Sequence, residues 1–294
     1  MEKLSGYAFV AGMLSTGLAT VFYLLYALSG LRAARMQTTG MQMSTGAMGF
    51  VSGPRTGPIG RYATMLGWLA VFALLASLVF RTIATGHGPF ANMYEFSEAF
   101  GFGIIAAYMW FERRYHQRIL ALVALPVALA MMLYAWSIQG PVEPLVPALQ
   151  NNLLLTVHVA VAIVAFGSFA IAFAASVLYL VQPAGGRWGL PKPEVLDEIG
   201  YRAVVVGFPF LTLTIILGAV WAQTAWGTYW SWDPKETASL VTWFIYGSYL
   251  HARVMRGWRG QRAAWLLVIG FAATLFTYFG NLVFGGLHSY AGLK

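Results

Sequence analysis

The stretch Trp226–Glu236, W-G-T-Y-W-S-W-D-P-K-E, packs three tryptophans, a tyrosine and three charged residues into eleven positions. It lies between two long apolar runs, so we expect it at a membrane surface. Flat aromatic faces beside a carboxylate and a lysine suit a planar ligand that is apolar in the middle and charged at one edge. Trp and Tyr also collect at the level of lipid headgroups. A belt of that kind would spread over many helix ends, so the clustering favours a ligand platform, and we call residues 224–237 the tryptophan loop.

The composition is that of a membrane protein. Of 294 residues, 59% are hydrophobic and only 10% are charged, whereas about a quarter of a soluble domain is charged. The absence of cysteine excludes thiol catalysis, thiolate metal sites and disulfides. The net charge of +8 is explained by membrane topology, and no nucleic-acid motif is present, so we predict lipid and no nucleic acid as a partner. We predict a single membrane domain over residues 1–294.

Apolar runs of about 20 residues are the signal for membrane-spanning helices. Eight such runs predict an all-α polytopic membrane protein with both termini on the same side. The predicted spans are residues 7–30, 62–84, 93–112, 118–137, 153–181, 203–223, 237–254 and 263–284.

The distribution of Lys and Arg over the loops predicts the orientation. Of the 18 basic residues, 14 fall in the first, third, fifth and seventh loops, which we therefore predict to be cytoplasmic. Both termini, the loop near His87, the segment 138–152 and the tryptophan loop are then extracytoplasmic. The 14 residues are Arg32, Arg35, Arg55, Arg61, Arg113, Arg114, Arg118, Arg187, Lys192, Arg202, Arg253, Arg256, Arg259 and Arg262.

Three connecting segments have a distinct character. Residues 36–53 are rich in Met, Gly, Ser and Thr without periodicity, and they predict a mobile cytoplasmic loop. Residues 138–152 contain three prolines and predict an outer loop. Residues 194–202, E-V-L-D-E-I-G-Y-R, predict a short amphipathic helix on the cytoplasmic surface.

Two histidines are predicted at the depth of the tryptophan loop. His158 lies a few residues inside the fifth span, and His288 lies just beyond the eighth. A six-coordinate haem needs two axial ligands and apolar surface around the ring, and neutral imidazole is a usual nitrogen ligand. We therefore predict haem b with His158 and His288 on its iron. Taken alone, His158 fits equally a hydrogen-bonded histidine of a helix bundle, and His288 an ordinary surface residue.

The other histidines lie elsewhere. His251 is 15 residues beyond Glu236, roughly 22 Å along a continuous helix and therefore near the cytoplasmic side. We predict it as a ligand of a second, inner haem, or of the same haem earlier in its transit. The second ligand it would need is not convincing within the chain, because His116 has arginine neighbours and looks like a solvated loop residue. We expect a structural role for His87.

The charged residues near the outer end have two interpretations. Arg81 and Lys235 are predicted to meet the haem propionates, and the planar fork of arginine is the better match to a carboxylate. Asp233 and Glu236 could act in acid–base chemistry, but Asp233-Pro234 followed by Glu236 equally predicts a helix start with a reciprocal cap. The predicted aromatic haem contacts are Trp221, Trp226, Tyr229, Trp230 and Trp232.

At these positions the sequence resembles a known family. W-G-T-Y-W-S-W-D-P-K-E resembles the tryptophan-rich (WWD) signature of the haem-handling proteins CcsA (also called ResC), CcmC and CcmF. Residues 232–253 are similar to the loop and following span of the CcsA family, whose transmembrane histidine matches His251. Residues 152–159 and 285–290 resemble the segments with its two external histidines, here His158 and His288. Residues 86–95 resemble its outer loop, and the similarity covers about 80–290.

The resemblance implies a subunit of a system II holocytochrome c synthase (cytochrome c haem lyase), active with its partner. Haem moves to the outer face and is joined by thioether bonds to the cysteines of a C-x-x-C-H motif in apocytochrome c. The implied partner is a CcsB (ResB, Ccs1) protein, which in the family supplies the other ligand of the inner haem. The implied location is the bacterial cytoplasmic (inner) membrane, with the active site on the outer or periplasmic face, or the thylakoid membrane in a plastid.

Three alternatives remain. A CcmC-like protein delivers haem without forming the thioether, but chains of that type have fewer spans than the eight predicted here. A b-type electron-transfer cytochrome requires paired histidines in both leaflets, and only His251 is available on the inner side. A plain transporter would release haem outside.

Overall fold

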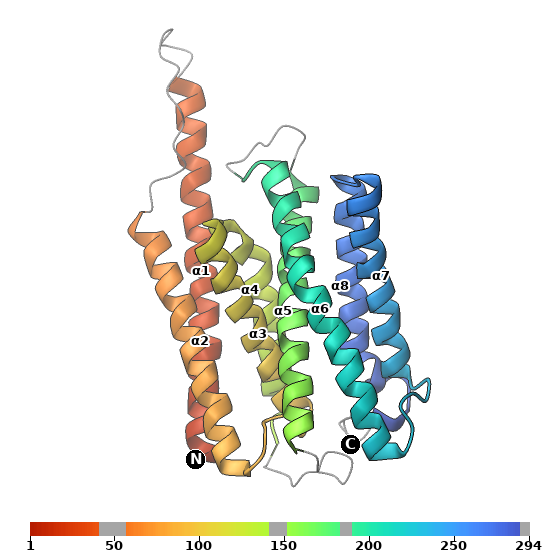
Figure 1. The fold of residues 1–294 in the computed structure, drawn as a ribbon. Coiled ribbons are helices and arrows are strands. Elements are labelled where there is room, and N and C mark those ends of the chain that lie inside the picture. Colours follow the sequence, from red (N-terminus) through yellow and green to blue (C-terminus); the bar gives the residue numbers. More distant parts are fainter. Residues whose placement is uncertain (41–56, 141–151, 183–189, 289–294) are drawn as a thin grey trace.

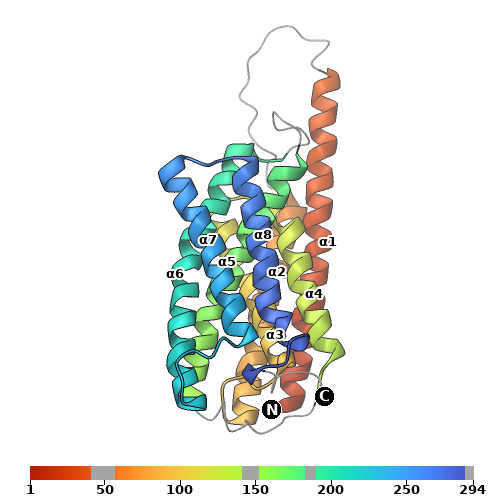
Figure 2. The same ribbon diagram turned by 90° about the vertical axis from the view of Figure 1, so that its right-hand side faces the viewer.

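The chain is built of α-helices that run side by side along one axis (Figures 1 and 2). The computed structural model describes residues 1–40, 57–140, 152–182 and 190–288, and no strand occurs among them. The α-helices are α1 (Glu2–Gly40), α2 (Pro58–Thr85), α3 (Met93–Tyr115), α4 (Ala121–Ser137), α5 (Asn152–Val181), α6 (Pro193–Trp226), α7 (Pro234–Arg256) and α8 (Gln261–Phe279). Two short 3-10 helices are η2 (Arg118–Leu120) and η4 (Gly280–Leu282).

Consecutive helices alternate in direction. The pair α1–α2 forms one side of the bundle and the pair α7–α8 the other, with α3 to α6 between them (Figure 1). The N-terminus, the loop between α6 and α7, and η4 therefore lie at the same end of the molecule (Figure 2). We call this the loop end and the opposite end the arginine end.

Among the described residues, six helical segments are long and apolar enough to cross a membrane, which confirms a multi-pass membrane protein. They are Glu2–Gly30 of α1, α2, η2 with α4, Leu153–Val181 of α5, α6 and α8. The predicted spans 93–112 and 237–254 form helices α3 and α7, but these fall outside that set. The reason is polar content, since α3 carries three glutamates and two arginines and α7 carries several hydroxyl side chains, His251 and two arginines.

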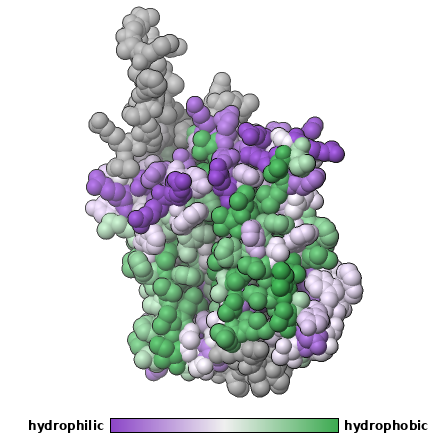
Figure 3. Space-filling view, viewed as in Figure 1, coloured by the Kyte–Doolittle hydropathy of each residue, from purple (hydrophilic) through white to green (hydrophobic). Residues whose placement is uncertain are grey.

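The outer surface divides into an apolar body and a hydrophilic cap. Green, hydrophobic residues cover most of the length of the bundle in Figure 3, and purple, hydrophilic residues gather at the arginine end. Exposed arginines at this end come from the last turns of α3 and α7 and the first turns of α6 and α8: Arg113, Arg114, Arg256, Arg202 and Arg262. This concentration is the feature on which the predicted orientation depends.

Two predicted connections differ from the structure. The separate surface helix predicted at 194–202 is wrong, because these residues are the first turns of a continuous α6. Pro193 is at the first helical position, which suits proline, and the buried Leu196 and Ile199 carry the apolar face into the bundle. Residues 36–40 of the predicted loop 36–53 belong to α1, whereas 41–53 of that loop, and 141–151 of the predicted outer loop, lie outside the described residues.

Buried ionic groups tie the helices together at the arginine end. Arg253 of α7 donates from Nη1 to Asp197 of α6 over 2.6 Å, and their side chains are only 5% and 10% exposed. Asp197 also accepts the backbone N–H of Gly260, just before α8. In the other half of the bundle, Glu112 of α3 accepts hydrogen bonds from the hydroxyls of Tyr23 in α1 and Thr64 in α2.

Replacing Arg253 with Ala should destabilise the fold, because Asp197 would remain buried without its cation. Losing one partner of a buried ion pair costs about 3–5 kcal/mol. Arg202→Ala is the matched control, because the Arg202–Glu198 pair is 57% and 44% exposed and such pairs contribute only about 0.2–1 kcal/mol. Thermal unfolding of the purified proteins in detergent measures both, and equal shifts in Tm would contradict this account.

Candidate functional site

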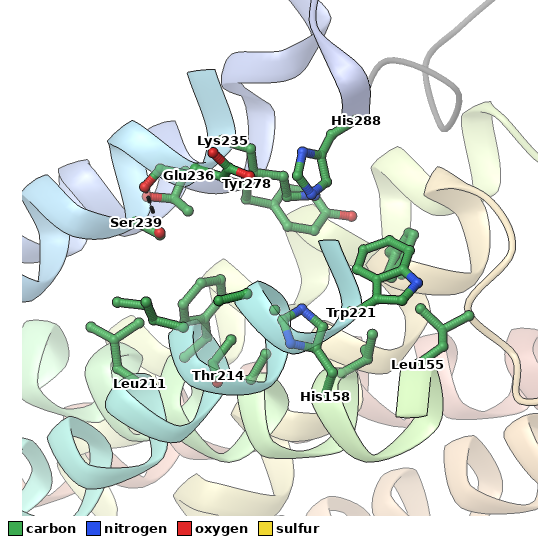
Figure 4. Close-up of a pocket in the computed structure, with 18 of the residues that line it drawn as sticks. Leu155, His158, Leu211, Thr214, Trp221, Lys235, Glu236, Ser239, Tyr278 and His288 are labelled. Carbon is green, nitrogen blue, oxygen red and sulfur yellow. Dashed lines mark hydrogen bonds between the residues drawn. The ribbon is translucent and has the colours of Figure 1, made fainter. Parts of the chain in front are cut away.

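A cavity opens at the loop end, between α3, α5, α6, α7 and α8 (Figure 4). Its empty volume is about 1040 Å³, counting the part that opens to the outside. Most of the wall is apolar, and the polar groups gather where α7 begins and at His158 and His288.

The walls follow from helical periodicity. Leu155, His158, Ala162 and Phe166 line the cavity from α5 at spacings of three and four residues, which places them on one helix face. Met93, Phe96 and Phe100 do the same from α3, and Leu211, Thr214, Gly218 and Trp221 from α6. The sequence analysis missed all of these except His158 and Trp221. The spacing of three and four residues from His158 along α5 was the sequence signal that could have identified Leu155, Ala162 and Phe166 as lining residues.

The structure brings His158 and His288 to the same tryptophan. The ring centroids of His158 and Trp221 are 6.0 Å apart, and those of Trp221 and His288 are also 6.0 Å apart. The two imidazoles are therefore separated by no more than twice that distance. Figure 4 shows them on different sides of the cavity, His158 from α5 and His288 from the segment after η4, with Trp221 beside them. Trp226 packs edge-on against His288, with centroids 4.9 Å apart.

His158 has a buried nitrogen without a partner. Its Nδ1 makes no hydrogen bond to any described residue, and leaving a buried polar atom unpaired is costly. Gly218 of α6 lies against the ring, and a Cβ built on it would be 3.0 Å from Cε1 of His158. The absence of a side chain at Gly218 therefore leaves room for the His158 imidazole in the cavity wall.

His288 is held by a carboxylate. Its Nδ1 lies 2.8 Å from Oδ1 of Asp233. Burial lowers the pKa of His288 and outweighs the opposing hydrogen bond to Asp233. Burial alone would raise the pKa of Asp233, but hydrogen bonds from His288 and from the N–H groups of Lys235 and Leu287 lower it to about 2. Near neutral pH a neutral His288 therefore donates Nδ1–H to an ionised Asp233, and Nε2 is the unprotonated nitrogen.

The tryptophan loop is shaped by the caps of two helices. α6 ends at Gly227 in the left-handed region (φ 76°), where glycine is favoured. α7 begins with Asp233 as N-cap and Glu236 bonded back to the N–H of Asp233 at 3.2 Å, so the predicted reciprocal cap is confirmed. Glu236 also accepts from the N–H of Ser231 at 2.8 Å. Between the caps Trp232 adopts φ 60°, which is uncommon for a bulky residue and marks a strained loop.

The predicted aromatic contacts separate into two groups. Trp221, Tyr229 and Trp230 line the cavity. Trp226 contacts His288 and Trp221 from outside the lining, with a centroid distance of 5.4 Å to Trp221. Trp232 is 70% exposed and contacts Trp230 edge-on at 5.8 Å.

The two predicted propionate partners are placed differently. Lys235 lines the cavity together with Glu236, and its Nζ lies 5.6 Å from the centre of the Phe96 ring. Arg81 is not among the lining residues. Its Nε donates to Oε1 of Glu95 at 2.8 Å, and both side chains are buried between α2 and α3.

The remaining histidines lie away from the cavity. His251 is exposed on α7, which is continuous from Glu236 to His251 as assumed above. His116 is exposed and forms the C-cap of α3 in the left-handed region (φ 55°). His87 is buried, and its Nδ1 lies 2.8 Å from the carbonyl oxygen of Gly88, which is compatible with a structural role.

Residues 90–288, which include the tryptophan loop and His158, His251 and His288, match the family described as cytochrome c assembly protein. The chain belongs to this family. Cytochrome c biogenesis protein CcsA of Gloeobacter violaceus is 34% identical, with 80% of this chain and 87% of that protein covered. CcsA of Guillardia theta is also 34% identical, over 80% of this chain and 86% of its own length. The chain is therefore a CcsA-type cytochrome c biogenesis protein.

A solved structure supports the fold. The cytochrome c haem lyase CcmF superposes with a TM-score of 0.63 at 21% identity, over 92% of this chain and 46% of CcmF. The chain thus spans about half the length of that protein. This similarity supports the arrangement of the helices and says nothing of the activity.

Replacing Gly218 with Ala should weaken haem binding, because the His158 ring must move by a few tenths of an ångström to admit the new Cβ. Gly17→Ala on α1 is the control, since a Cβ there meets nothing within 4 Å. The haem content and absorption spectrum of the purified variants measure the effect. A Gly218→Ala protein with unchanged haem content and spectrum would contradict this expectation.

Replacing Arg81 with Ala should lower stability, since Glu95 would be left buried without its cation, at a cost of about 3–5 kcal/mol. Thermal unfolding measures the stability, and haem retained per folded protein measures the site. With Lys235 as the propionate partner, haem per folded molecule should fall in Lys235→Ala but not in Arg81→Ala. A loss of haem from folded Arg81→Ala protein would indicate that Arg81 does contribute to haem binding.

Proposed function

We propose that this chain holds haem b at the extracytoplasmic end of the bundle, with His158 and His288 as axial ligands, and presents it for attachment to apocytochrome c. The observation that carries the proposal is the pair of imidazoles that line one cavity beside Trp221.

The rest of the cavity fits the same ligand. The walls from α3, α5 and α6 are apolar, as the porphyrin ring requires, and Tyr229 and Trp230 add flat faces from the tryptophan loop. Lys235 supplies a cation on the wall for a propionate. We assign Arg81 to the support of α3 through Glu95, because its Nε is paired there and its side chain does not line the cavity.

The chemistry belongs largely to the haem and the substrate. A cysteine thiol of the C-x-x-C-H motif adds across a haem vinyl group, so that a carbon–sulfur bond forms and the thiol proton passes to the neighbouring vinyl carbon. The protein's contribution is to orient the cofactor and hold it until the substrate arrives. Asp233 and Glu236 are engaged as helix caps, so we assign no catalytic acid or base to this chain.

The proposal includes a membrane orientation. With the arginine end in the cytoplasm, all eight helices cross or line the membrane, and the termini and the tryptophan loop face outward. The membrane is then the bacterial cytoplasmic membrane or the thylakoid membrane. The alternation of helix directions and the hydrophilic arginine end in Figure 3 support this orientation.

His251 and the partner form the second part of the proposal. His251 is exposed on α7, which packs against α6 and α8, and an ionisable side chain facing lipid is costly and usually functional. We propose that a CcsB-type membrane protein covers this face and supplies the second ligand of an inner haem at His251. Haem passing from there to His158 and His288 would cross most of the length of α7.

Replacing His158 or His288 with Ala should reduce haem content to a small fraction and abolish covalent attachment. His116→Ala is the control, because His116 is exposed and lies at the arginine end. The assay combines the purified chain, its CcsB-type partner, reduced haem and an apocytochrome with a C-x-x-C-H motif. Covalent haem on the substrate supports the synthase, whereas non-covalent transfer alone indicates a CcmC-like delivery protein or an exporter. Stable haem that is never transferred indicates an electron-transfer cytochrome.

A further inference from the structure

Asp233 at the loop end has hydrogen-bond partners on both of its carboxylate oxygens. Its Oδ1 accepts the N–H of Lys235 at 2.9 Å and lies 2.8 Å from Nδ1 of His288. Its Oδ2 accepts the N–H of Leu287 at 2.6 Å. The side chain is 2% exposed, so these bonds are shielded from water. One carboxylate thus connects the start of α7 to a segment more than fifty residues later.

Helix capping alone does not account for this arrangement. A capping aspartate needs only the N–H groups of its own first turn, and here Lys235 supplies that contact. The bonds to Leu287 and His288 come from another part of the chain. The backbone at Gly286 approaches so closely that a Cβ built there would lie 2.2 Å from Oδ2 of Asp233.

We propose that Asp233 is the positioning residue for the outer haem ligand, orienting the His288 ring and setting its strength as a donor to iron. This inference rests on the proposed function. Because both oxygens of Asp233 already accept backbone N–H groups, Nδ1 of His288 is placed as a further donor and Nε2 is left to coordinate iron. The edges of Trp221 and Trp226 restrict the ring on its other sides.

The expected consequence is control of the iron's reduction potential. A carboxylate that accepts from the second nitrogen of a metal-bound imidazole fixes its tautomer and raises its basicity, and losing such a partner weakens metal binding about 10- to 100-fold. A more basic imidazole stabilises the ferric iron, so Asp233 holds the potential lower than a neutral partner would. His158, whose Nδ1 has no such partner among the described residues, is then the weaker donor of the two and the one displaced first by the substrate histidine.

The test is Asp233→Asn in the full chain, purified with its haem. Asparagine keeps the size of the side chain and an acceptor for the cap but removes the charge and one acceptor oxygen. We expect a more positive reduction potential by spectroelectrochemistry, a changed ligand-field spectrum and about 10- to 100-fold weaker haem binding. Glu236→Gln is the comparison, since it removes the same charge from the same loop without touching His288, and its shift in potential should be smaller.

A second background shows whether Asp233 acts through His288. In His288→Gly protein supplied with 1-methylimidazole, which has no N–H to donate to Asp233, adding Asp233→Asn should no longer shift the potential. A shift that persists there means a general electrostatic effect and overturns the proposal, as does a folded Asp233→Asn protein with unchanged potential and spectrum. If Asp233→Asn does not fold, Gly286→Ala keeps the carboxylate but pushes the segment of His288 away from it, and it should shift the potential in the same direction.

The two hypotheses fail in different ways. If His288→Ala leaves the haem spectrum unchanged, His288 is not a ligand and the proposed function is wrong. If His288→Ala changes the spectrum and neither Asp233→Asn nor Gly286→Ala alters the potential, only the positioning role is wrong.

Discussion

The loop end depends on one buried carboxylate. Asp233 starts α7, and through Leu287 and His288 it also fixes the segment after η4. Without these bonds the segment after α8 could adopt many conformations, and ordering it into one of them costs conformational entropy. Bonds to a carboxylate shielded from water are stronger than neutral ones, so a single side chain brings His288 to the same tryptophan as His158.

Much of the site was predictable because it rests on local sequence. The tryptophan loop, the reciprocal cap of Asp233 and Glu236, and the depth of His158 and His288 each follow from residue types over a few positions. The wall of α5 follows from His158 by helical spacing. The bond between Asp233 and His288 was not predictable, since nothing in the sequence indicates that the C-terminal segment folds back onto the start of α7.

The features that the sequence did not reveal have physical causes of the same kind. Arg81 looks like a free outer cation in the sequence, and only the packing of α2 against α3 reveals Glu95 beside it. The nine residues 194–202 look like a short surface helix because their polar face is visible and their continuation into α6 is not. The polar residues of α3 and α7 weaken the membrane-span signal although both helices run the length of the bundle. In each case the role of the residues depends on burial and on pairing between helices that are distant in the sequence.

The most direct test is the coordination of iron in the haem-loaded wild-type protein. Electron paramagnetic resonance of the ferric form, with ¹⁵N-labelled histidine, counts the imidazole nitrogens bound to the metal. This account predicts a low-spin, six-coordinate iron with two histidine nitrogens, reduced to one in His158→Ala protein. A high-spin iron, or a spectrum that His158→Ala and His288→Ala both leave unchanged, would contradict it.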